Sequence, residues 1–268
     1  MEIIQSRSNP LIIECVKLRD RAYRKEKGLF FFEGRKLFDE AIARGVEFFA
    51  ILASEKAAGY VIEKAPKLDQ ARLVQVSDSV MEKISEEKSP DGIFCVAKTI
   101  DICHDFATIY NNRNIEGRKL VLSSIRDPGN LGTIIRSAAA LGVKELIISS
   151  DCADLYNSKT VRATMGALFS QKISIVDDLP SSIKYLNSLG YKTYAAVLRE
   201  GAIKVNELTI DHSTCFVVGN EGHGLDDGVI DACSGSCIIP MEKGAESLNA
   251  AIAASLFIWE GYRREIGG

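Results

Sequence analysis

Residues 215–224 have the sequence CFVVGNEGHG, an apolar run that gives way to a glycine-rich polar loop. A continuous apolar run is typical of a parallel strand that is covered by helices on both faces. The glycines allow the loop backbone to approach a ligand closely, and Asn220, Glu221 and His223 supply polar groups. The G-x-x-G-x-G spacing differs from the dinucleotide fingerprint, and the chain has no P-loop motif. The stretch therefore predicts a ligand loop at the carboxyl end of a parallel strand.

A second polar segment, RDPGNLG at residues 126–132, also follows an apolar run. Residues 127–130 form a turn signature, and Asn130 is the expected N-cap of the next helix. Arg136 lies off the apolar stripe of that helix, where small neighbours leave room beside the guanidinium. Those neighbours are Gly132, Thr133, Ala139 and Ala140. A capped helix with a solvent-facing arginine would explain this segment equally well.

A third segment joins Ile239-Pro240-Met241 to Ser247-Leu248-Asn249. Ser247 is the expected N-cap of the last helix, which is apolar almost all round and is therefore expected to be buried. A buried Asn249 needs a hydrogen-bonding partner, which a ligand or the Glu221 loop could supply. A structural role alone would account for Asn249 nearly as well.

The composition is that of an ordinary soluble globular protein. The chain has 268 residues, of which 46% are hydrophobic and 26% charged. It has no apolar run long enough to span a membrane and no signal-peptide pattern at its start, so a cytoplasmic location is expected. Seven scattered cysteines without a metal-ligand spacing indicate reduced thiols and no metal site.

Alternating apolar runs and helical patterns predict two α/β layers. The first occupies residues 1–97, a less apolar stretch at 98–117 is the expected linker, and the second layer occupies 118–268. In the second layer the predicted strands are 119–123, 144–148, 192–196, 215–218 and 236–239, with helices beginning near Leu131, Ser158, Leu179 and Ser247. In the first layer the apolar runs are 29–32, 48–52, 72–76 and 92–97, with helical patterns at 34–44 and 79–84.

Charge is distributed unevenly along the chain. The net charge of −3 does not indicate a nucleic-acid protein. Residues 17–36, however, carry a local excess of about five positive charges that could follow a phosphate backbone. A solvated helix face is an equally good explanation of that cluster.

Taken together, the three segments resemble the ordered motifs of the SpoU-TrmH branch of the SPOUT methyltransferases, which are RNA ribose 2′-O-methyltransferases. The resemblance covers about residues 118–265 in order, spacing and identity, and includes the family-like segment 161–168. The first half is similar, more loosely, to the ribosomal-protein-like substrate-binding domain of longer family members. The matching residues there are 8–10, 24–25, 32–34 and 92–93.

The resemblance implies a fold, a cofactor and a set of site residues. It implies a parallel-sheet SPOUT domain with a deep trefoil knot, a smaller N-terminal α/β domain, a homodimer, and S-adenosylmethionine as cofactor. The implied catalytic residues are Arg136, Asn130, Glu221, Ser247 and Asn249. The implied cofactor-binding residues are Leu198, Gly219, Asn220, Gly224, Ile239, Met241 and Leu248. Arg24, Lys25 and Arg162 are the expected RNA-binding residues.

The expected reaction is methylation of a ribose 2′-hydroxyl, in ribosomal RNA because the N-terminal domain is present. Methylation of tRNA, a noncatalytic RNA-binding protein of the same fold and a small-molecule nucleotide enzyme remain as alternatives. In the family the arginine matched by Arg136 is assigned to the ribose hydroxyl. Deprotonating a free arginine at pH 7 costs about 8 kcal/mol, so a general base and a charge that stabilises the forming alkoxide both remain open.

Overall fold

The computed structural model describes residues 3–66, 72–100, 117–220 and 222–267. The chain divides into two compact units, each described below by itself. Unit 1 comprises Met1–Ile100 and Asp154–Ser170, and unit 2 comprises Asp101–Ala153 and Gln171–Gly268. Residues 154–170 fall within the predicted second domain but make their contacts in unit 1. Most of the predicted linker lies outside the described residues.

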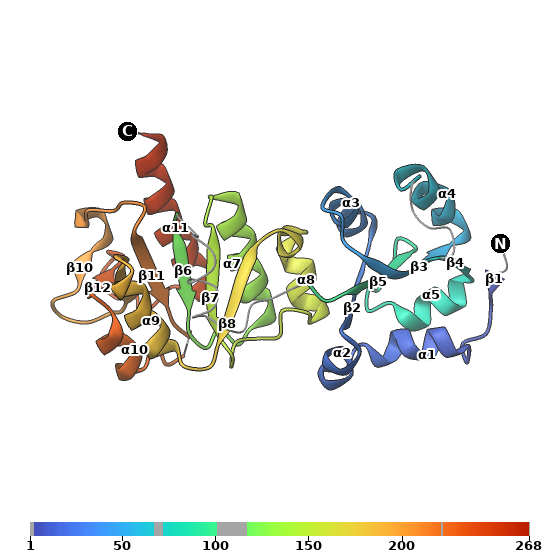
Figure 1. The fold of residues 1–268 in the computed structure, drawn as a ribbon, viewed down its shortest axis with the longest axis horizontal. Helices are drawn as coiled ribbons and strands as arrows, with labels where there is room; N and C mark the ends of the chain where they lie inside the picture. The colour runs from blue at the N-terminus through green and yellow to red at the C-terminus, as the bar shows by residue number, and fades with distance from the viewer. Residues whose placement is uncertain (1–2, 67–71, 101–116, 221, 268) are drawn as a thin grey trace. The chain divides into compact units, whose positions relative to one another are not determined.

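Unit 2 is built on a parallel seven-stranded sheet of order β10-β12-β9-β11-β6-β7-β8 (Figure 1). Its strands are β6 (Lys119–Leu122), β7 (Glu145–Ser149), β8 (Lys172–Val176), β9 (Lys192–Ala196), β10 (Ile203–Lys204), β11 (Thr214–Val218) and β12 (Gly235–Ile238). The five predicted strands are confirmed to within one residue at each end. The strands β8 and β10 were not predicted from the sequence.

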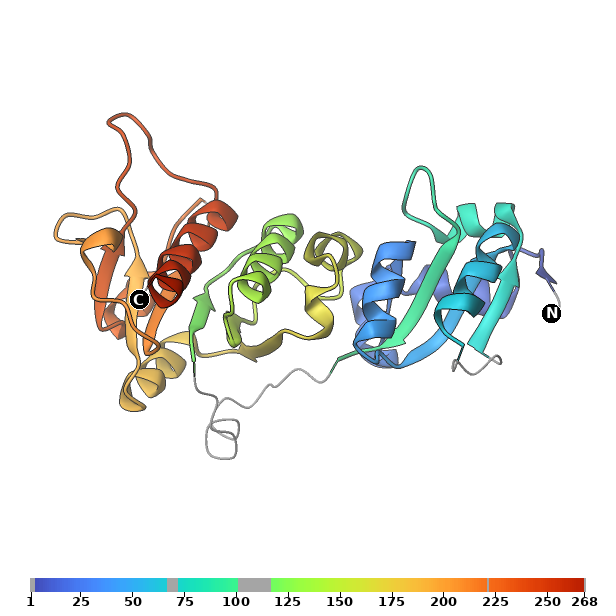
Figure 2. The same cartoon turned by 90° about the horizontal axis from the view of Figure 1, so that it is seen from above.

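Helices cover both faces of this sheet. On one face α7 (Pro128–Ala140) packs beside α11 (Ala250–Ile266), as Figure 2 shows, and Phe257 of α11 contacts Phe216 of β11 with ring centroids 4.8 Å apart. On the other face α9 (Leu179–Ser188) and α10 (Asp227–Ala232) share a core with the alternate residues of the strands. The apolar runs thus form a core on both sides, as a parallel sheet requires.

Two predicted helix caps are wrong. Asp127, not Asn130, caps α7: its carboxylate accepts a hydrogen bond from the Asn130 amide at 2.8 Å. Pro128 can then occupy the first helical position, where no amide hydrogen is needed. Asn249, not Ser247, caps α11 by accepting hydrogen bonds from the amides of Ala251 and Ile252. In both places the observed cap lies at a neighbouring polar residue in the same turn segment.

The prediction that the last helix is buried is also wrong for part of its surface. Ile252, Leu256 and Trp259 are 52%, 41% and 45% exposed, while Ala254 and Phe257 face the core. The exposed residues recur every three to four positions and form one stripe along α11. An apolar pattern on all sides predicts burial without saying what covers each side.

Unit 1 contains a mixed five-stranded sheet of order β1-β4-β3-β5-β2. Its strands are β1 (Ile3–Ile4), β2 (Leu29–Glu33), β3 (Phe48–Ser54), β4 (Leu73–Val76) and β5 (Ile93–Lys98), and its helices are α1 (Pro10–Lys17), α2 (Arg21–Lys27), α3 (Arg35–Ala43), α4 (Glu55–Lys64), α5 (Asp78–Ile84) and α8 (Ser158–Thr164). The four predicted apolar runs are strands, and both predicted helical patterns are helices. Helices α1, α2 and α4 were not predicted from the sequence.

Candidate functional site

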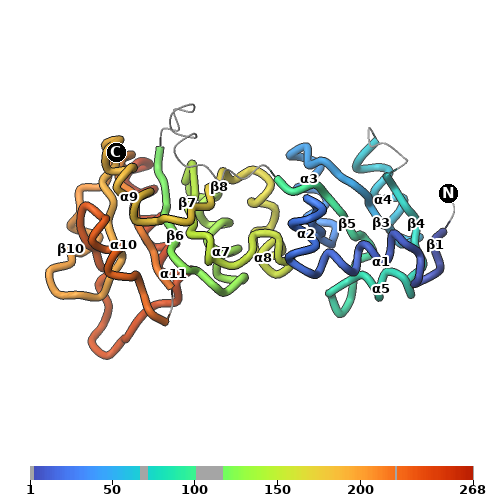
Figure 3. Tube along the Cα trace, turned by 60° about the horizontal axis from the view of Figure 1, so that its bottom comes forward, coloured from blue at the N-terminus to red at the C-terminus, as the bar shows by residue number. Residues whose placement is uncertain are grey.

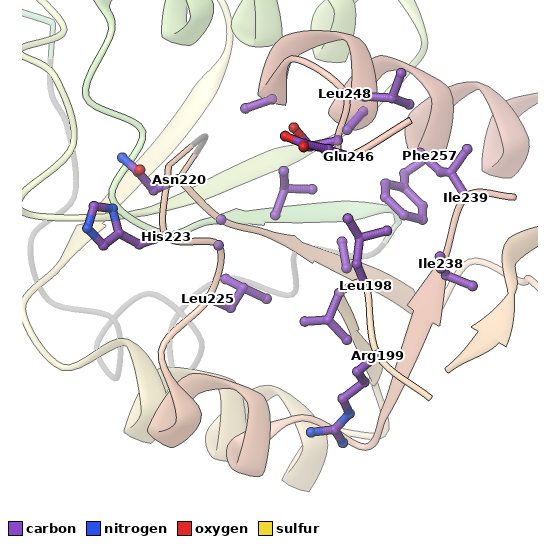
Figure 4. A pocket seen from close by; sticks show the side chains of 18 of the residues that line it. Leu198, Arg199, Asn220, His223, Leu225, Ile238, Ile239, Glu246, Leu248 and Phe257 are labelled. Carbon is purple, nitrogen blue, oxygen red and sulfur yellow. The ribbon is translucent and has the colours of Figure 1, made fainter. Parts of the chain in front are cut away.

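A cavity of about 530 Å³ opens at the carboxyl ends of β9, β11 and β12 (Figure 4). Its walls come from three separate segments of the chain, those that follow these three strands. All seven residues predicted to bind a cofactor line this one cavity: Leu198, Gly219, Asn220, Gly224, Ile239, Met241 and Leu248. The carboxyl edge of an open parallel sheet is where ligand sites form, so the placement follows from the topology.

The glycine loop after β11 is closed by its own backbone. The amide of Asn220 donates to the Gly224 carbonyl and the Gly224 amide donates back to the Asn220 carbonyl, both at 3.0 Å. The Gly222 amide donates to Asn220 Oδ1 at 2.8 Å. Gly224 has a φ of +70°, which favours glycine. A Cβ on Gly219 would lie far inside contact distance of the Gly224 carbonyl, so this loop requires glycine there.

The side chain of Asn220 joins the glycine loop to the loop after β6. Its Nδ2 donates to the Ser124 carbonyl at 2.8 Å, and the Ser123 amide donates to the Val218 carbonyl at 2.9 Å. The second contact continues the β6–β11 pairing by one residue. The loops that carry the first two sequence motifs are therefore fixed to each other directly.

The first turns of α7 and α11 also meet. Nδ2 of Asn249 donates to Oδ1 of Asn130 at 3.1 Å, and Ser255 donates to Ser137 at 2.9 Å further along the same pair of helices. Arg136 lies on the exposed side of α7. The structure thus brings together two predicted catalytic residues, Asn130 and Asn249, and places Arg136 on the same helix as Asn130.

The remaining predicted catalytic residues are Ser247 and Glu221. Ser247 lines the cavity and is exposed. Glu221 lies outside the described residues, so its predicted role stays a prediction.

The three predicted RNA-binding residues differ in how far their side chains are exposed to solvent. Arg24 is only 4% exposed, donates to the carbonyls of Leu18 and Arg19, and is paired with Asp154. Because its side chain is almost fully buried, Arg24 presents no surface to a phosphate, so the structure argues against its predicted RNA contact. Lys25 is exposed. Arg162 is partly exposed and lies 3.4 Å from Glu87.

Three further polar residues line the cavity without having been predicted as cofactor ligands. They are Arg199, His223 and Glu246 (Figure 4). Arg199 and Glu246 each adjoin a predicted site residue in the sequence, which is the signal that could have found them. His223 belongs to the quoted glycine loop, where the sequence indicated a polar group close to a ligand.

The cysteines and the long helices add no further site in the described parts of the chain. The six cysteines described are all free thiols, and burial raises the pKa of Cys15 and of Cys237 to about 12. Within the described ranges, no group of three or more His, Cys, Asp or Glu side chains could hold a metal ion. Among the helices described, none is long and apolar enough to cross a bilayer.

The fold and the cavity define a class of protein: an α/β protein with a small-molecule site at the carboxyl edge of a parallel sheet. Comparison with known families then names the family. Residues 117–259 match the SpoU rRNA Methylase family, and residues 9–95 match the MRM3-like substrate binding domain. The chain belongs to the SpoU rRNA Methylase family. The expected parallel-sheet methyltransferase domain with an N-terminal substrate-binding domain is confirmed.

Individual relatives match over nearly the whole chain. The 23S rRNA (guanosine(2553)-2′-O)-methyltransferase RlmP of Bacillus subtilis is 29% identical, covering 97% of this chain and 98% of the relative. A putative TrmH family tRNA/rRNA methyltransferase of Staphylococcus aureus is 34% identical, with 86% and 94% covered. The crystal structure of an AdoMet-bound rRNA methyltransferase from Sinorhizobium meliloti superposes with a TM-score of 0.84 at 26% identity, covering 99% and 98%.

Proposed function

We propose that this protein transfers a methyl group from S-adenosylmethionine to a ribose 2′-hydroxyl of ribosomal RNA. The observation that carries the proposal is the single cavity formed by all seven predicted cofactor residues, which come from three segments between residues 198 and 248. Family membership supports the reaction. The Bacillus subtilis relative, named for a 23S rRNA methylation, matches over both units and so supports ribosomal RNA.

The cavity suits S-adenosylmethionine in size and chemistry. A volume of about 530 Å³ lies within the usual range for a ligand pocket. Leu198, Ile239 and Leu248 offer an apolar wall for an adenine ring, and the glycine loop leaves its backbone accessible. Arg199 and Glu246 add one charge of each sign, which matches the carboxylate and ammonium of a methionine group.

The reaction requires a ribose oxygen aligned with the methyl group, and the proton that this oxygen loses passes to solvent water. When bound, the sulfonium of the cofactor supplies a methyl group on a good leaving group. The protein's part is to orient the ribose and stabilise charge on its oxygen. We assign that part to Arg136, whose side chain lies on the exposed side of α7 and offers a planar fork of donors to the substrate. Asn130 and Asn249, bonded to each other, hold the start of the Arg136 helix beside the cavity.

The direct test is incubation of the protein with methyl-labelled S-adenosylmethionine and unmodified ribosomal RNA or tRNA in separate reactions. The expected result is label in a ribose of ribosomal RNA. The labelled nucleotide is mapped as the linkage that resists alkaline cleavage. Label in tRNA alone would show that tRNA, and not ribosomal RNA, is the substrate. Cofactor binding without transfer to either RNA would favour a noncatalytic RNA-binding role.

The predicted trefoil knot is supported by the path of the chain between β9 and β11, which Figure 3 allows the reader to follow. On this path β10 pairs with the outer edge of β12, and the 3₁₀ helix η3 (Val205–Glu207) contacts α11. Arg264 of α11 donates to the Asn206 carbonyl at 3.1 Å. Residues 197–213 therefore pass outside both β12 and α11, as a loop enclosing the C-terminal segment would.

A homodimer is supported by the exposed stripe of α11. Ile252, Leu256 and Trp259 form a contiguous row of large apolar side chains on a helix that otherwise packs into the core. Exposed apolar patches of this kind mark protein interfaces. We assign the stripe to the predicted contact with a second copy of this chain, which would also cover the apolar side that the sequence pattern expected to be buried.

Replacing Leu256 with glutamate is expected to convert the protein from a dimer to a monomer. A carboxylate at the centre of a paired apolar stripe would have to lose its hydration without a partner. The molecular mass measured by light scattering after size-exclusion chromatography should fall from twice 29.3 kDa to 29.3 kDa. The matched control is Ile62→Glu, an exposed isoleucine on α4 of unit 1, which should remain a dimer. A dimeric Leu256→Glu protein would contradict the assignment.

Reversing the charge of Lys25 is expected to weaken RNA binding and reduce its salt dependence. Lys25 is exposed in the basic cluster, and each lost phosphate contact lowers the slope of log K against log salt by about 1. Binding of Lys25→Glu to ribosomal RNA would be titrated across salt concentrations. The comparison is Lys56→Glu, an exposed lysine on α4. An unchanged slope for Lys25→Glu would remove this residue from the proposed RNA surface.

A further inference from the structure

The turn after β6 has an unusual backbone. Ser124 has a φ of +56°, in the left-handed region that favours glycine. Among the described residues, Met165 is the one other residue without this freedom that has a positive φ. Non-glycine residues persist in this region where surrounding contacts hold them, often next to a functional site.

Ser124 is held by two side chains from the end of β7. Its amide donates to Ser149 Oγ at 2.8 Å, and its hydroxyl donates to Asp151 Oδ2 at 2.6 Å. Ser149 in turn donates to Asp151 Oδ1 at 2.6 Å. Asp151 thus binds both hydroxyls with its two oxygens and closes a ring of three hydrogen bonds around the Ser124 turn. Arg126 adds a longer contact of 3.4 Å to the same carboxylate.

The ring is built for an ionised carboxylate. Burial acts to raise the pKa of Asp151, but the hydroxyl donors Ser124 and Ser149 and the nearby Arg126 outweigh it, so the pKa lies below its ordinary value. Asp151 is therefore an acceptor at neutral pH, as the two donated hydrogen bonds require.

The Ser124 turn positions the two parts of the proposed site. Its carbonyl accepts the hydrogen bond from Asn220 Nδ2 at 2.8 Å, which fixes the glycine loop that lines the cavity. Three residues later Asp127 caps α7, the helix that carries Arg136. A rotation of the Ser124 peptide would move this carbonyl and the start of α7 together.

We propose that Asp151 is a positioning residue for methyl transfer: by holding Ser124 in its left-handed conformation, it aligns the cofactor loop with the Arg136 helix. The inference rests on the proposed function. It adds a residue that neither lines the cavity nor contacts Arg136. It acts through the backbone of Ser124, and a glycine at position 124 would adopt the same conformation without the ring of hydrogen bonds.

The test combines a loss with a rescue. Asp151→Ala is expected to weaken S-adenosylmethionine binding, measured by calorimetry without RNA, and to lower kcat/KM by roughly 10- to 100-fold, since small misplacements of a site are costly. In the double variant Ser124→Gly/Asp151→Ala, both quantities should return to those of Ser124→Gly alone. The matched control is Asp177→Ala, an exposed aspartate directly after β8, which should bind cofactor like the parent protein.

Each outcome has a distinct meaning. Unchanged cofactor affinity and turnover in Asp151→Ala would overturn the inference. Equal losses in Asp151→Ala and in the double variant would also overturn it, because the carboxylate would then not act through the turn. A lower thermal unfolding temperature of Asp151→Ala would identify a loss of activity caused by general destabilisation. Glycine at position 124 would not restore activity lost in that way. If the parent protein methylates no RNA, the proposed function fails, while the calorimetric comparison still tests the alignment of the cofactor loop.

Discussion

Replacing Arg136 with alanine is expected to reduce methyl transfer by roughly 10³-fold, the scale of losing a group that stabilises charge in the transition state. Arg136 lies on the exposed side of α7 and does not line the described walls of the cavity. Its removal should therefore leave the affinity for S-adenosylmethionine within about twofold, a change well under 1 kcal/mol. A group that acts on the ribose and not on the cofactor has this combination of effects.

The measurement pairs labelled-methyl transfer with calorimetric binding of the cofactor. Lys184→Ala, an exposed cation on α9, is the control and should retain full turnover. Arg136→Lys keeps the charge but loses the planar fork, so partial activity would favour charge stabilisation by Arg136. Turnover of Arg136→Ala at the parent rate would refute the assignment.

Replacing Gly219 with alanine is expected to weaken cofactor binding by roughly 10- to 100-fold, because each factor of ten corresponds to about 1.4 kcal/mol. The new methyl group would collide with the backbone carbonyl of Gly224 and lie 2.9 Å from Leu225 Cδ2, and a backbone atom cannot move aside cheaply. Overpacking of this kind costs about 1–3 kcal/mol, and the loop that must open to relieve it forms the cavity wall.

Gly228→Ala is the matched control for Gly219→Ala. Gly228 lies in α10 with open space at its Cβ position, and alanine favours a helix. That variant should bind S-adenosylmethionine normally and unfold at the same or a higher temperature. If Gly219→Ala retained the parent affinity, the glycine loop would not form part of the cofactor site.

The sheet of unit 2 could be predicted because most of its strands are marked by their own apolar sequence, without reference to distant residues. Runs such as residues 215–218 are apolar throughout, and the polar loops that follow them mark one edge of the sheet. β10 escaped prediction because two residues, Ile203 and Lys204, carry no periodic signal. The caps of α7 and α11 were misplaced because Asp127 and Asn130, or Ser247 and Asn249, are all good capping residues, and only the folded backbone selects between them.

The burial of individual polar and apolar side chains depended on contacts far away in the sequence. Arg24 looked like one basic residue of a cluster, but its partner Asp154 is 130 positions away. Ile252 and Leu256 were expected in the core because an apolar helix pattern does not say which of its sides the rest of the chain covers. Asp151 had no motif around it, and its contacts with Ser124 and Ser149 exist only because β6 and β7 are neighbours.

The helix α11 connects the proposed site to the proposed dimer contact, since its cap Asn249 belongs to the site and its exposed stripe begins at Ile252, three residues later. On the proposed pairing, the dimer contact thus stiffens the same turn that holds Asn130. Catalytic output per molecule would then depend on dilution: specific activity should decline once the enzyme concentration falls below the dissociation constant of the dimer. Kinetic constants measured at a single low enzyme concentration would underestimate the activity of the dimer.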